Sequence, residues 1–423
     1  MIQLSILRND PQAIIERLAL KNYNAKSLVD EILKCDDERR FTQKTLDDNL
    51  AESNKIAKTI GEFFKSGKAQ EANALKETTV ELKKTAKDLE EKLNGLESTL
   101  NGLLVQLPNP PHSSIKPGKT PEDNEIVYSE GKMPELAESA VPHWDLAARY
   151  NLIDFELGNK ITGAGFPVYK GKGARLQRAL INFFLDNAVA AGFTEIQPPL
   201  MVNEASAYGT GQLPDKDGQM YHAQIDNLYL IPTAEVPVTN LYRDMILKEK
   251  DFPIKNVAYS ACFRREAGSY GKDVRGLNRL HQFDKVEIVQ IQHPDKSYET
   301  LEEMREYVCG LLRKLELPFR VLKLCGGDMS FTSALTYDME VWSAAQQRWL
   351  EVSSVSNFES YQANRMKLRY KSDDGKINLA HTLNGSALAL PRIVASLLEN
   401  NQTEAGIVIP KALISYTGFE IIN

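Results

Sequence analysis

The chain has 423 residues, enough for two or three domains, and its 42% hydrophobic content supplies the side chains of a sizeable core. Its 51 basic and 57 acidic residues give a formal charge of −6. This balance argues against a protein that coats nucleic acid through a generally basic surface, although it leaves a local basic patch open. No apolar run approaches the ~20 residues of a membrane helix, and Asp10 and Pro11 come before a signal sequence could form. We expect a soluble, cytoplasmic protein that spans no membrane.

The cysteines and histidines indicate neither a disulfide framework nor a zinc site. The four cysteines and six histidines are scattered along the chain, and no CxxC spacing is present. Structural zinc sites and disulfide-rich folds both need such residues at close, regular spacings. We therefore expect no zinc.

The first quarter of the chain predicts two long helices, since no proline occurs between Leu28 and Leu107. Its second half has leucines at the spacings of seven, four and three that are typical of a coiled coil: Leu75, Leu82, Leu89, Leu93, Leu96, Leu100, Leu103 and Leu107. The first half has a weaker stripe, which is interrupted by polar side chains: Arg39, Thr42, Asn49 and Ser53. Because Lys65-Ser66-Gly67-Lys68 indicates a tight turn, we expect an antiparallel helical hairpin over about residues 27–104.

Two interpretations of this hairpin stay open on the residues alone. It could be a coil for dimerisation or spacing, or a protruding arm that contacts a large partner. The second interpretation is compatible with lysines on the outer face of the first helix, which allow phosphate contacts without proving them: Lys44, Lys55, Lys58 and Lys65.

Beyond the hairpin the sequence predicts a linker and an α+β domain. An N-terminal domain of residues 1–107 is followed by a proline-rich linker at 108–125 and a domain at 126–423. Helices are predicted at Arg175–Gly192, with Leu176, Leu180, Phe183, Phe184 and Val189 on the apolar side, and at Ser297–Leu315. Strands are predicted at Asn227–Ile231, Val257–Phe263, Lys285–Ile291 and Phe319–Leu324. Strands that follow strands favour an antiparallel sheet, and neither GxGxxG nor GxxxxGK[ST] is present.

Five segments of this domain concentrate polar and charged residues. They are Thr233-Ala234-Glu235, Arg264-Arg265-Glu266, Arg279 to Phe283 with Glu287 beyond it, Glu351-Val352-Ser353-Ser354, and Asn384-Gly385-Ser386 with Arg392 beyond it. Taken singly, each segment is a weak signal, and an arginine and a glutamate two residues apart on a strand more often form a surface or structural ion pair than a catalytic one. The glycine-rich loop between Glu266 and Arg279 predicts a flexible β-hairpin tip or an ordinary solvated loop.

In their order along the chain, these segments resemble the three signature motifs of class II aminoacyl-tRNA synthetases, and specifically those of the seryl-tRNA synthetase family. A helix followed by GFTEIQPPLMV with Pro199 looks like the dimer-interface motif, Phe263–Glu266 with Arg279 and Phe283 looks like the second motif, and Asn384–Arg392 looks like the third. The seryl-specific segments are GTGQLP, TAEVPVTN, HQFDKVEIV and EVSSVSNF. With the helical hairpin, the resemblance covers essentially the whole chain.

The resemblance implies ATP-dependent attachment of L-serine to tRNA-Ser, and also to tRNA-Sec, through a seryl-adenylate, by a homodimer. It implies that Arg264 and Arg392 are catalytic, and that serine is bound by Thr233, Ala234, Glu235, Arg264, Glu287, Asn384 and Ser386. ATP is implied to meet Arg264, Arg265, Glu266, Arg279, Phe283, Glu351, Val352, Ser353, Ser354 and Arg392, with Mg²⁺ on Glu351 and Ser354. The N-terminal domain is implied to bind tRNA through its hairpin.

Two other functions compete with this one. A synthetase-derived binding protein would keep the fold without charging tRNA, and we expect such a copy to lose a phosphate-binding arginine or the metal carboxylate. An amino-acid ligase acting on a carrier protein would lack the hairpin. This chain retains Arg264, Glu266, Glu351, Arg392 and the hairpin, which favours the charging enzyme.

Overall fold

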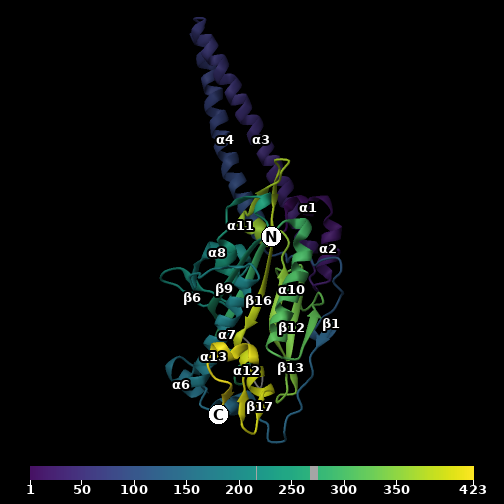
Figure 1. Ribbon diagram of the computed structural model, residues 1–423. Coiled ribbons are helices and arrows are strands. Elements are labelled where there is room, and N and C mark those ends of the chain that lie inside the picture. The colour runs from purple at the N-terminus through teal and green to yellow at the C-terminus, as the bar shows by residue number, and fades with distance from the viewer. Residues whose placement is uncertain (216, 267–274) are drawn as a thin grey trace. The chain divides into compact units, whose positions relative to one another are not determined.

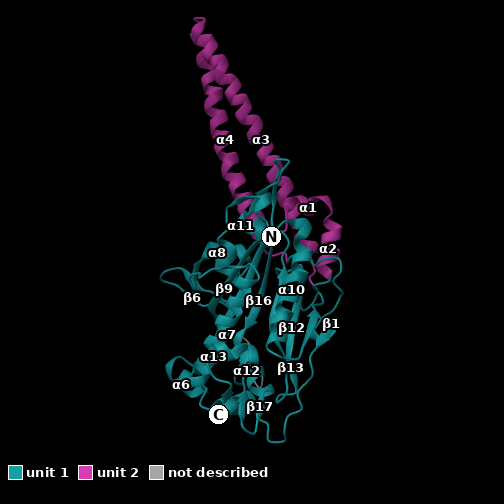
Figure 2. Ribbon diagram, in the orientation of Figure 1, with its two compact units in different colours: residues 1, 20–22, 109–423 teal, residues 2–19, 23–108 magenta. Residues whose placement is uncertain are grey.

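The computed structural model describes residues 1–215, 217–266 and 275–423. The chain divides into two compact units (Figure 2). The hairpin unit consists of Ile2–Ala19 and Tyr23–Pro108, and the larger unit consists of Met1, Leu20–Asn22 and Asn109–Asn423. No helix within the described residues has the length and apolar character needed to cross a membrane.

The hairpin unit confirms the predicted antiparallel pair of helices (Figure 1). Its helices are α1 (Leu4–Asn9), α2 (Pro11–Ala19), α3 (Lys26–Lys65) and α4 (Ala69–Leu104). The turn between α3 and α4 contains Gly67, whose φ of +76° is a conformation that glycine adopts without strain. Leu93 and Leu100 of the predicted stripe are buried, so the leucine spacing identified the packing face of α4.

One polar interruption on α3, Arg39, has a partner that the leucine spacing did not reveal. Asp36 is fully buried, and its carboxylate pairs with Arg8 of α1 at 2.7 Å and with Arg39 at 3.0 Å. Arg39 thus satisfies a buried charge instead of only weakening the apolar stripe. Thr42, one turn further along, is also buried.

The larger unit is built on one sheet whose eight strands, counted within the described residues, have the order β1-β11-β12-β13-β16-β10-β9-β4. Their bounds are β1 (Glu125–Glu130), β11 (Phe319–Lys323), β12 (Leu335–Ser343), β13 (Arg348–Asn357), β16 (His381–Ala389), β10 (Gln282–Gln292), β9 (Ile254–Phe263) and β4 (Thr194–Glu195). Neighbouring strands are antiparallel except β4 and β9, which are parallel. The α+β class with an antiparallel sheet is therefore confirmed.

Helices and short strands surround this sheet (Figure 1). The helices are α5 (His143–Arg149), α6 (Phe155–Ile161), α7 (Gly171–Ala190), α8 (Glu204–Thr210), α9 (Glu235–Asn240), α10 (Ser297–Lys314), α11 (Tyr361–Met366), α12 (Leu390–Asn400) and α13 (Ile414–Thr417). The short strands are β2 (Ile153–Asp154), β3 (Val168–Tyr169), β5 (Met201–Asn203), β6 (His222–Ala223), β7 (Leu228–Leu230), β8 (Ile246–Lys248), β14 (Arg369–Lys371), β15 (Ile377–Leu379), β17 (Gln402–Thr403), β18 (Gly406–Val408) and β19 (Ile421–Ile422).

The two faces of the sheet have different roles. One face packs against α7, α10 and α12 in a single hydrophobic core, to which β10 contributes Val286 and Ile288. Because side chains alternate along a strand, Lys285 and Glu287 point to the opposite face. That opposite face is where the polar residues of the central strands gather.

All the predicted helices and strands are confirmed within a few residues, with one error in a side-chain assignment. Val189 was placed on the apolar side of the helix that is now α7, and its side chain is 48% exposed. Val189 is five positions after Phe184, so at about 100° per residue the Val189 side chain points away from the buried stripe. Strands β12, β13 and β16 were not predicted, because polar side chains such as Asp338 and Asn384 interrupt their apolar pattern.

Candidate active site

A cavity of about 1010 Å³ lies over the polar face of the central sheet in the larger unit. Its lining comes from strands β10, β12, β13 and β16, from the segment after β9, and from the first turn of α12. Strand pairing creates this arrangement, since Glu287 of β10 is the register partner of Ser386 on β16 and Asp338 of β12 is the partner of Ser354 on β13. Residues that are far apart in the sequence are thereby collected on one surface.

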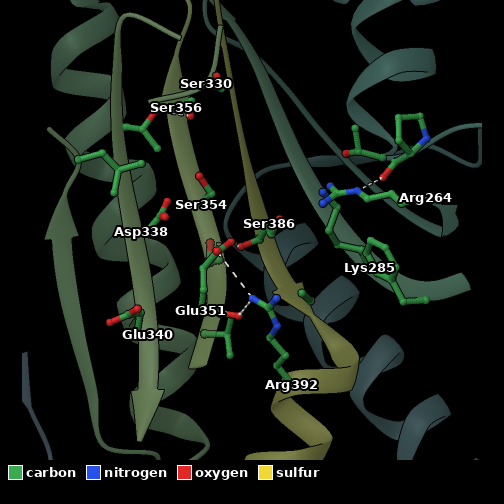
Figure 3. A pocket seen from close by; sticks show the side chains of 18 of the residues that line it. Arg264, Lys285, Ser330, Asp338, Glu340, Glu351, Ser354, Ser356, Ser386 and Arg392 are labelled. Carbon is green, nitrogen blue, oxygen red and sulfur yellow. Dashed lines mark hydrogen bonds and ion pairs between the residues drawn. The ribbon is translucent and has the colours of Figure 1, made fainter. Parts of the chain in front are cut away.

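The two arginines with predicted catalytic roles both line this cavity. Arg264 follows the end of β9, where its Nε donates to the carbonyl of Pro232 at 3.3 Å and its guanidinium lies over the ring of Phe283 at 5.3 Å. Arg392 is held by the backbone carbonyls of Asn278 and Glu351, at 3.2 Å and 2.7 Å. Figure 3 shows Arg392 reaching towards Glu351, with Arg264 across the cavity. Two fixed positive charges therefore face a shared space.

One end of the cavity is a buried polar cluster of a size suited to a small molecule. Lys285 and Glu287 form an ion pair at 2.6 Å, and the Ser386 hydroxyl donates to the same Glu287 oxygen at 3.4 Å. Glu235 accepts a hydrogen bond of 2.6 Å from Gln362. Burial first, and the charge of Glu287 second, raise the pKa of the Glu235 carboxyl to about 7. These carboxylates suit a ligand that brings a positive charge and a hydroxyl group.

Thr233 and Asn384, also predicted for serine, lie in the same cluster. Both line the cavity and both are buried, at 4% and 7% exposure. Thr233 lies two residues before the start of α9, and its hydroxyl accepts a hydrogen bond of 3.2 Å from the backbone N–H of Glu235, which fixes the entry to that short helix.

The predicted adenine contacts lie next to Arg264. Glu266, three residues beyond the end of β9, adopts a positive φ of 47° and pairs with Arg279 at 3.0 Å. Phe283 lies on the neighbouring strand and also lines the cavity. An aromatic ring, a guanidinium and a carboxylate acceptor at one site match the stacking surface and the amino group of a purine.

The residues present fit a divalent cation. This side of the cavity is lined by Glu351, Val352, Ser353 and Ser354. Asp338 lies beside Ser354 on the neighbouring strand (Figure 3). Oδ1 of Asp338 is buried without a hydrogen-bond partner among the described residues. Burial first, and the charge of Glu351 second, raise the pKa of this carboxyl well above its ordinary value. Hard oxygen donors with an unsatisfied carboxylate are what Mg²⁺ binds, and Glu351 and Ser354 are the residues that we expect to hold it.

Two predicted residues do not line the cavity. Ala234 is fully buried, packing with Val238, Ala258 and Val289. The Arg265 guanidinium lies over the Tyr221 ring at 6.0 Å. The predicted hairpin tip between Glu266 and Arg279 falls largely on residues 267–274, outside the described residues.

Sequence reasoning assigned no role to some residues that line the cavity. Lys285 is the most informative of them, because it is buried and pairs with Glu287. Its position two residues before Glu287 on a predicted strand was a usable signal, since such residues share a face. Asp338, Glu340 and Arg320 also line the cavity, but they lie on strands whose register had to be known first.

Comparisons with known proteins agree with this geometry. A family model described as the seryl-tRNA synthetase N-terminal domain matches residues 1–111, and one described as the tRNA synthetase class II core domain (G, H, P, S and T) matches residues 221–401. A serine–tRNA ligase of Salinibacter ruber is 53% identical, covering 100% of this chain and 99% of that protein. One of Chlorobaculum parvum is 46% identical, with 100% of both chains covered.

Solved structures give the same picture. Seryl-tRNA synthetase from Pyrococcus horikoshii complexed with ATP superposes with a TM-score of 0.93 at 34% identity, covering 100% of this chain and 99% of that one. The cytoplasmic serine–tRNA ligase of Naegleria fowleri in complex with AMP gives a TM-score of 0.87 at 25% identity, with 98% and 96% covered.

Proposed function

This chain belongs to the seryl-tRNA synthetase family, and on that premise we propose that it attaches L-serine to tRNA-Ser, and to tRNA-Sec, through a seryl-adenylate formed from ATP. The observation on which the proposal rests most is that Arg264 and Arg392 line one cavity together with a buried acidic cluster. The names of the matched relatives support serine and tRNA as the substrates.

In the first step, a serine carboxylate oxygen attacks the α-phosphorus of ATP, a new oxygen–phosphorus bond forms, and pyrophosphate leaves with the broken bond's electron pair. Arg264 holds the carboxylate and the α-phosphate together, because a guanidinium binds two anions at once. Arg392 holds the γ-phosphate of a bent ATP. Catalysis by positioning and by charge stabilisation needs no covalent enzyme nucleophile.

The remaining contacts orient the nucleotide. Phe283 stacks on the adenine ring, Glu266 accepts a hydrogen bond from its amino group, and Arg279 lies next to both. Glu351 and Ser354 hold Mg²⁺, which supplies positive charge at the phosphates when it is bound. Val352 and Ser353, which also line the cavity, complete this side of the site.

Selection of serine comes from polar complementarity. An apolar pocket separates small amino acids poorly, by roughly 1–3 kcal/mol per methylene, whereas a buried polar group left unpaired by alanine discriminates far better. We assign the amine and the hydroxyl of serine to one set of polar side chains: Thr233, Glu235, Glu287, Asn384 and Ser386. Lys285 keeps one oxygen of Glu287 occupied, so the other remains for the substrate.

In the second step, a ribose hydroxyl at the 3′ end of the tRNA attacks the adenylate carbonyl, and AMP leaves. We propose that α3 and α4 recognise the long variable arm of the tRNA by its shape, as phosphate contacts position a protein and do not read sequence. The outer face of α3 supports this with exposed lysines: Lys44, Lys55, Lys58 and Lys65.

We also propose a homodimer formed through α7, β4 and the segment with Pro199. Exposed apolar side chains on or beside this segment support it, namely Val189, Leu200 and Met201, at 48%, 40% and 38% exposure. Sedimentation equilibrium is expected to give twice the chain mass of 47.5 kDa. A monomer at micromolar concentration would contradict this part of the proposal.

Charging of unfractionated tRNA with labelled serine tests the whole function. We expect serine to be esterified only to tRNA-Ser and tRNA-Sec, identified by sequencing of the charged fraction. A variant in which residues 27–104 are replaced by a short linker should retain serine activation and lose charging. If no tRNA accepts serine from the complete chain, the proposal is wrong, and if the deletion abolishes both steps equally, the hairpin does not have the proposed role.

A further inference from the structure

A buried histidine–glutamate pair lies outside the residues assigned to substrates. His143 begins α5 and Glu399 lies in the last turn of α12, and both side chains are fully buried. The His143 imidazole Nδ1 lies 2.7 Å from Glu399 Oε1, and the His143 backbone N–H donates to the same oxygen at 3.0 Å. Ser343 donates to the other oxygen. Burial alone raises the pKa of the Glu399 carboxyl, but the hydrogen bonds from His143 and Ser343 hold it below its ordinary value.

The other imidazole nitrogen holds the segment that leads to Arg279. The backbone N–H of Leu277 donates to Nε2 of His143 at 2.9 Å. An amide can only donate, so Nε2 accepts, and Nδ1 has the proton and donates to Glu399. The segment lies very close to the ring, because a Cβ built on Gly276 would come within 2.3 Å of Nε2. Glu399 thus fixes the tautomer that Leu277 requires.

A second path joins the same pair to the nucleotide site. Gln346 donates to Glu399 at 2.9 Å, and its amide oxygen accepts from the Asn278 side chain at 3.0 Å. The backbone carbonyl of Asn278 accepts the hydrogen bond from Nε of Arg392. Arg392 and Glu399 are seven residues apart on α12, which puts them on the same side of that helix about two turns apart.

We propose that His143 and Glu399 are positioning residues for ATP: by fixing residues 277–279 through Leu277 and Gln346, they orient Arg392 and Arg279 toward the triphosphate and the adenine. This inference rests on the proposed function and deepens it. It assigns the pair to the nucleotide half of the cavity, because its hydrogen bonds lead to Asn278 and Arg392 and not to the Lys285–Glu287 cluster.

A buried ion pair that only stabilises the fold would behave differently. Its loss would lower the stability and the amount of active protein, while the KM values for ATP and serine would stay unchanged. Loss of a positioning pair raises KM for ATP selectively, because the displaced groups bind the nucleotide. Measurement of KM for ATP, KM for serine and stability in the same variants therefore distinguishes a positioning role from a purely structural one.

Two substitutions at His143 separate its two hydrogen bonds. In His143→Gln, the amide oxygen lies near the place of Nε2 and still accepts from Leu277, whereas in His143→Asn the amide nitrogen takes the place of Nδ1 and the Leu277 amide loses its acceptor. Serine-dependent exchange between pyrophosphate and ATP is expected to show KM for ATP raised about tenfold in the asparagine variant, as for one buried hydrogen bond lost, and nearly unchanged in the glutamine variant. KM for serine should change by less than about twofold in both.

His381→Asn is the matched control. His381 is another largely buried histidine, with Nδ1 at 2.8 Å from the Ser297 hydroxyl, and it begins β16 away from the cavity. This variant should lower stability without changing KM for ATP. Equal effects of the asparagine and glutamine variants at position 143, or equal rises in both KM values, would overturn the proposal.

Gln346→Leu leaves His143 and Glu399 in place and removes the side chain that joins Glu399 to Asn278. This substitution removes the hydrogen-bond partner of the Asn278 side chain and should raise KM for ATP selectively. If the His143 variants fail to fold, an unchanged KM for ATP in Gln346→Leu overturns the proposal. The wild-type enzyme tests the proposed reaction separately from the positioning role. If the wild type shows no serine-dependent exchange, the proposed reaction is refuted. If the wild type shows exchange but the variants do not raise KM for ATP selectively, only the positioning role is refuted.

Discussion

Replacing Glu235 by glutamine is expected to stabilise the larger unit above neutral pH while weakening serine binding. The Glu235 carboxyl is buried beside the charge of Glu287, and its pKa is raised from 4.5 to about 7. Glutamine keeps an oxygen for the hydrogen bond from Gln362 and removes the ionisable group. In the wild type, burial of the Glu235 charge therefore costs stability. The role of this charge is to bind the ammonium group of the substrate.

The size and the pH window of the effect follow from this raised pKa. At about 1.4 kcal/mol for each tenfold change in proton affinity, a rise from 4.5 to about 7 corresponds to about 3 kcal/mol. Below pH 4.5 the carboxyl is protonated in both the folded and the unfolded chain, so it has no effect on stability. As the pH rises from 4.5 to 7, the unfolded chain loses the proton first, and the wild-type free energy of unfolding falls. Above pH 7 the cost is fully present, and the glutamine variant avoids it.

Urea unfolding followed by tryptophan fluorescence measures the free energy of unfolding of the larger unit. The three tryptophans, Trp144, Trp342 and Trp349, all belong to the larger unit, so unfolding of the hairpin unit does not contribute to the signal. We expect Glu235→Gln to be more stable than wild type by about 3 kcal/mol at pH 8 and by much less at pH 5. Glu404→Gln, at an exposed position, is the control with no pH-dependent difference. The reasoning is refuted if Glu235→Gln is destabilising at pH 8, or if its advantage is the same at both pH values.

Three further predictions concern other parts of the molecule. Arg264→Ala should lower serine-dependent pyrophosphate exchange by at least about a hundredfold without changing the unfolding transition, since transition-state charge is left unpaired; near-normal exchange would remove the role assigned to Arg264. Glu351→Gln should raise the Mg²⁺ concentration needed for half-maximal ATP binding, measured by calorimetry, and an unchanged midpoint would place the cation elsewhere. Asp36→Asn should destabilise the hairpin unit by about 3 kcal/mol in thermal unfolding followed by circular dichroism, because Arg8 loses a buried partner; the neighbouring exposed Asp37→Asn is its control, and equal effects of the two would contradict the account.

The hairpin was predictable because its signal is local. Leucine spacing alone identified the packing face of α4, and Gly67 marked the turn. The buried ion pair of Asp36 and Arg8 was not predictable, because it joins two helices whose side chains are far apart in the sequence. Periodicity describes one helix at a time and does not show which polar interruption finds a partner.

The candidate site shows the same limit on a larger scale. Alternation on the predicted strand at Lys285–Ile291 was enough to put Lys285 and Glu287 on one face, although this signal was not used, but no spacing rule brings Arg264 and Arg392 to one cavity. Their meeting depends on the pairing of β9 with β10 and of β10 with β16, and on α12 following β16 directly. Only the resemblance to a family supplied that long-range information, and it did not single out Asp338 or His143, whose roles depend on burial and hydrogen bonding in the folded chain.

The most direct test of the proposed reaction is pyrophosphate exchange into ATP, measured with each of the twenty amino acids in turn and without tRNA. We predict exchange with serine alone, abolished in both the Arg264→Ala and the Arg392→Ala variants. Exchange that is absent with serine, or faster with another amino acid, would contradict the assignment of this cavity to serine and ATP.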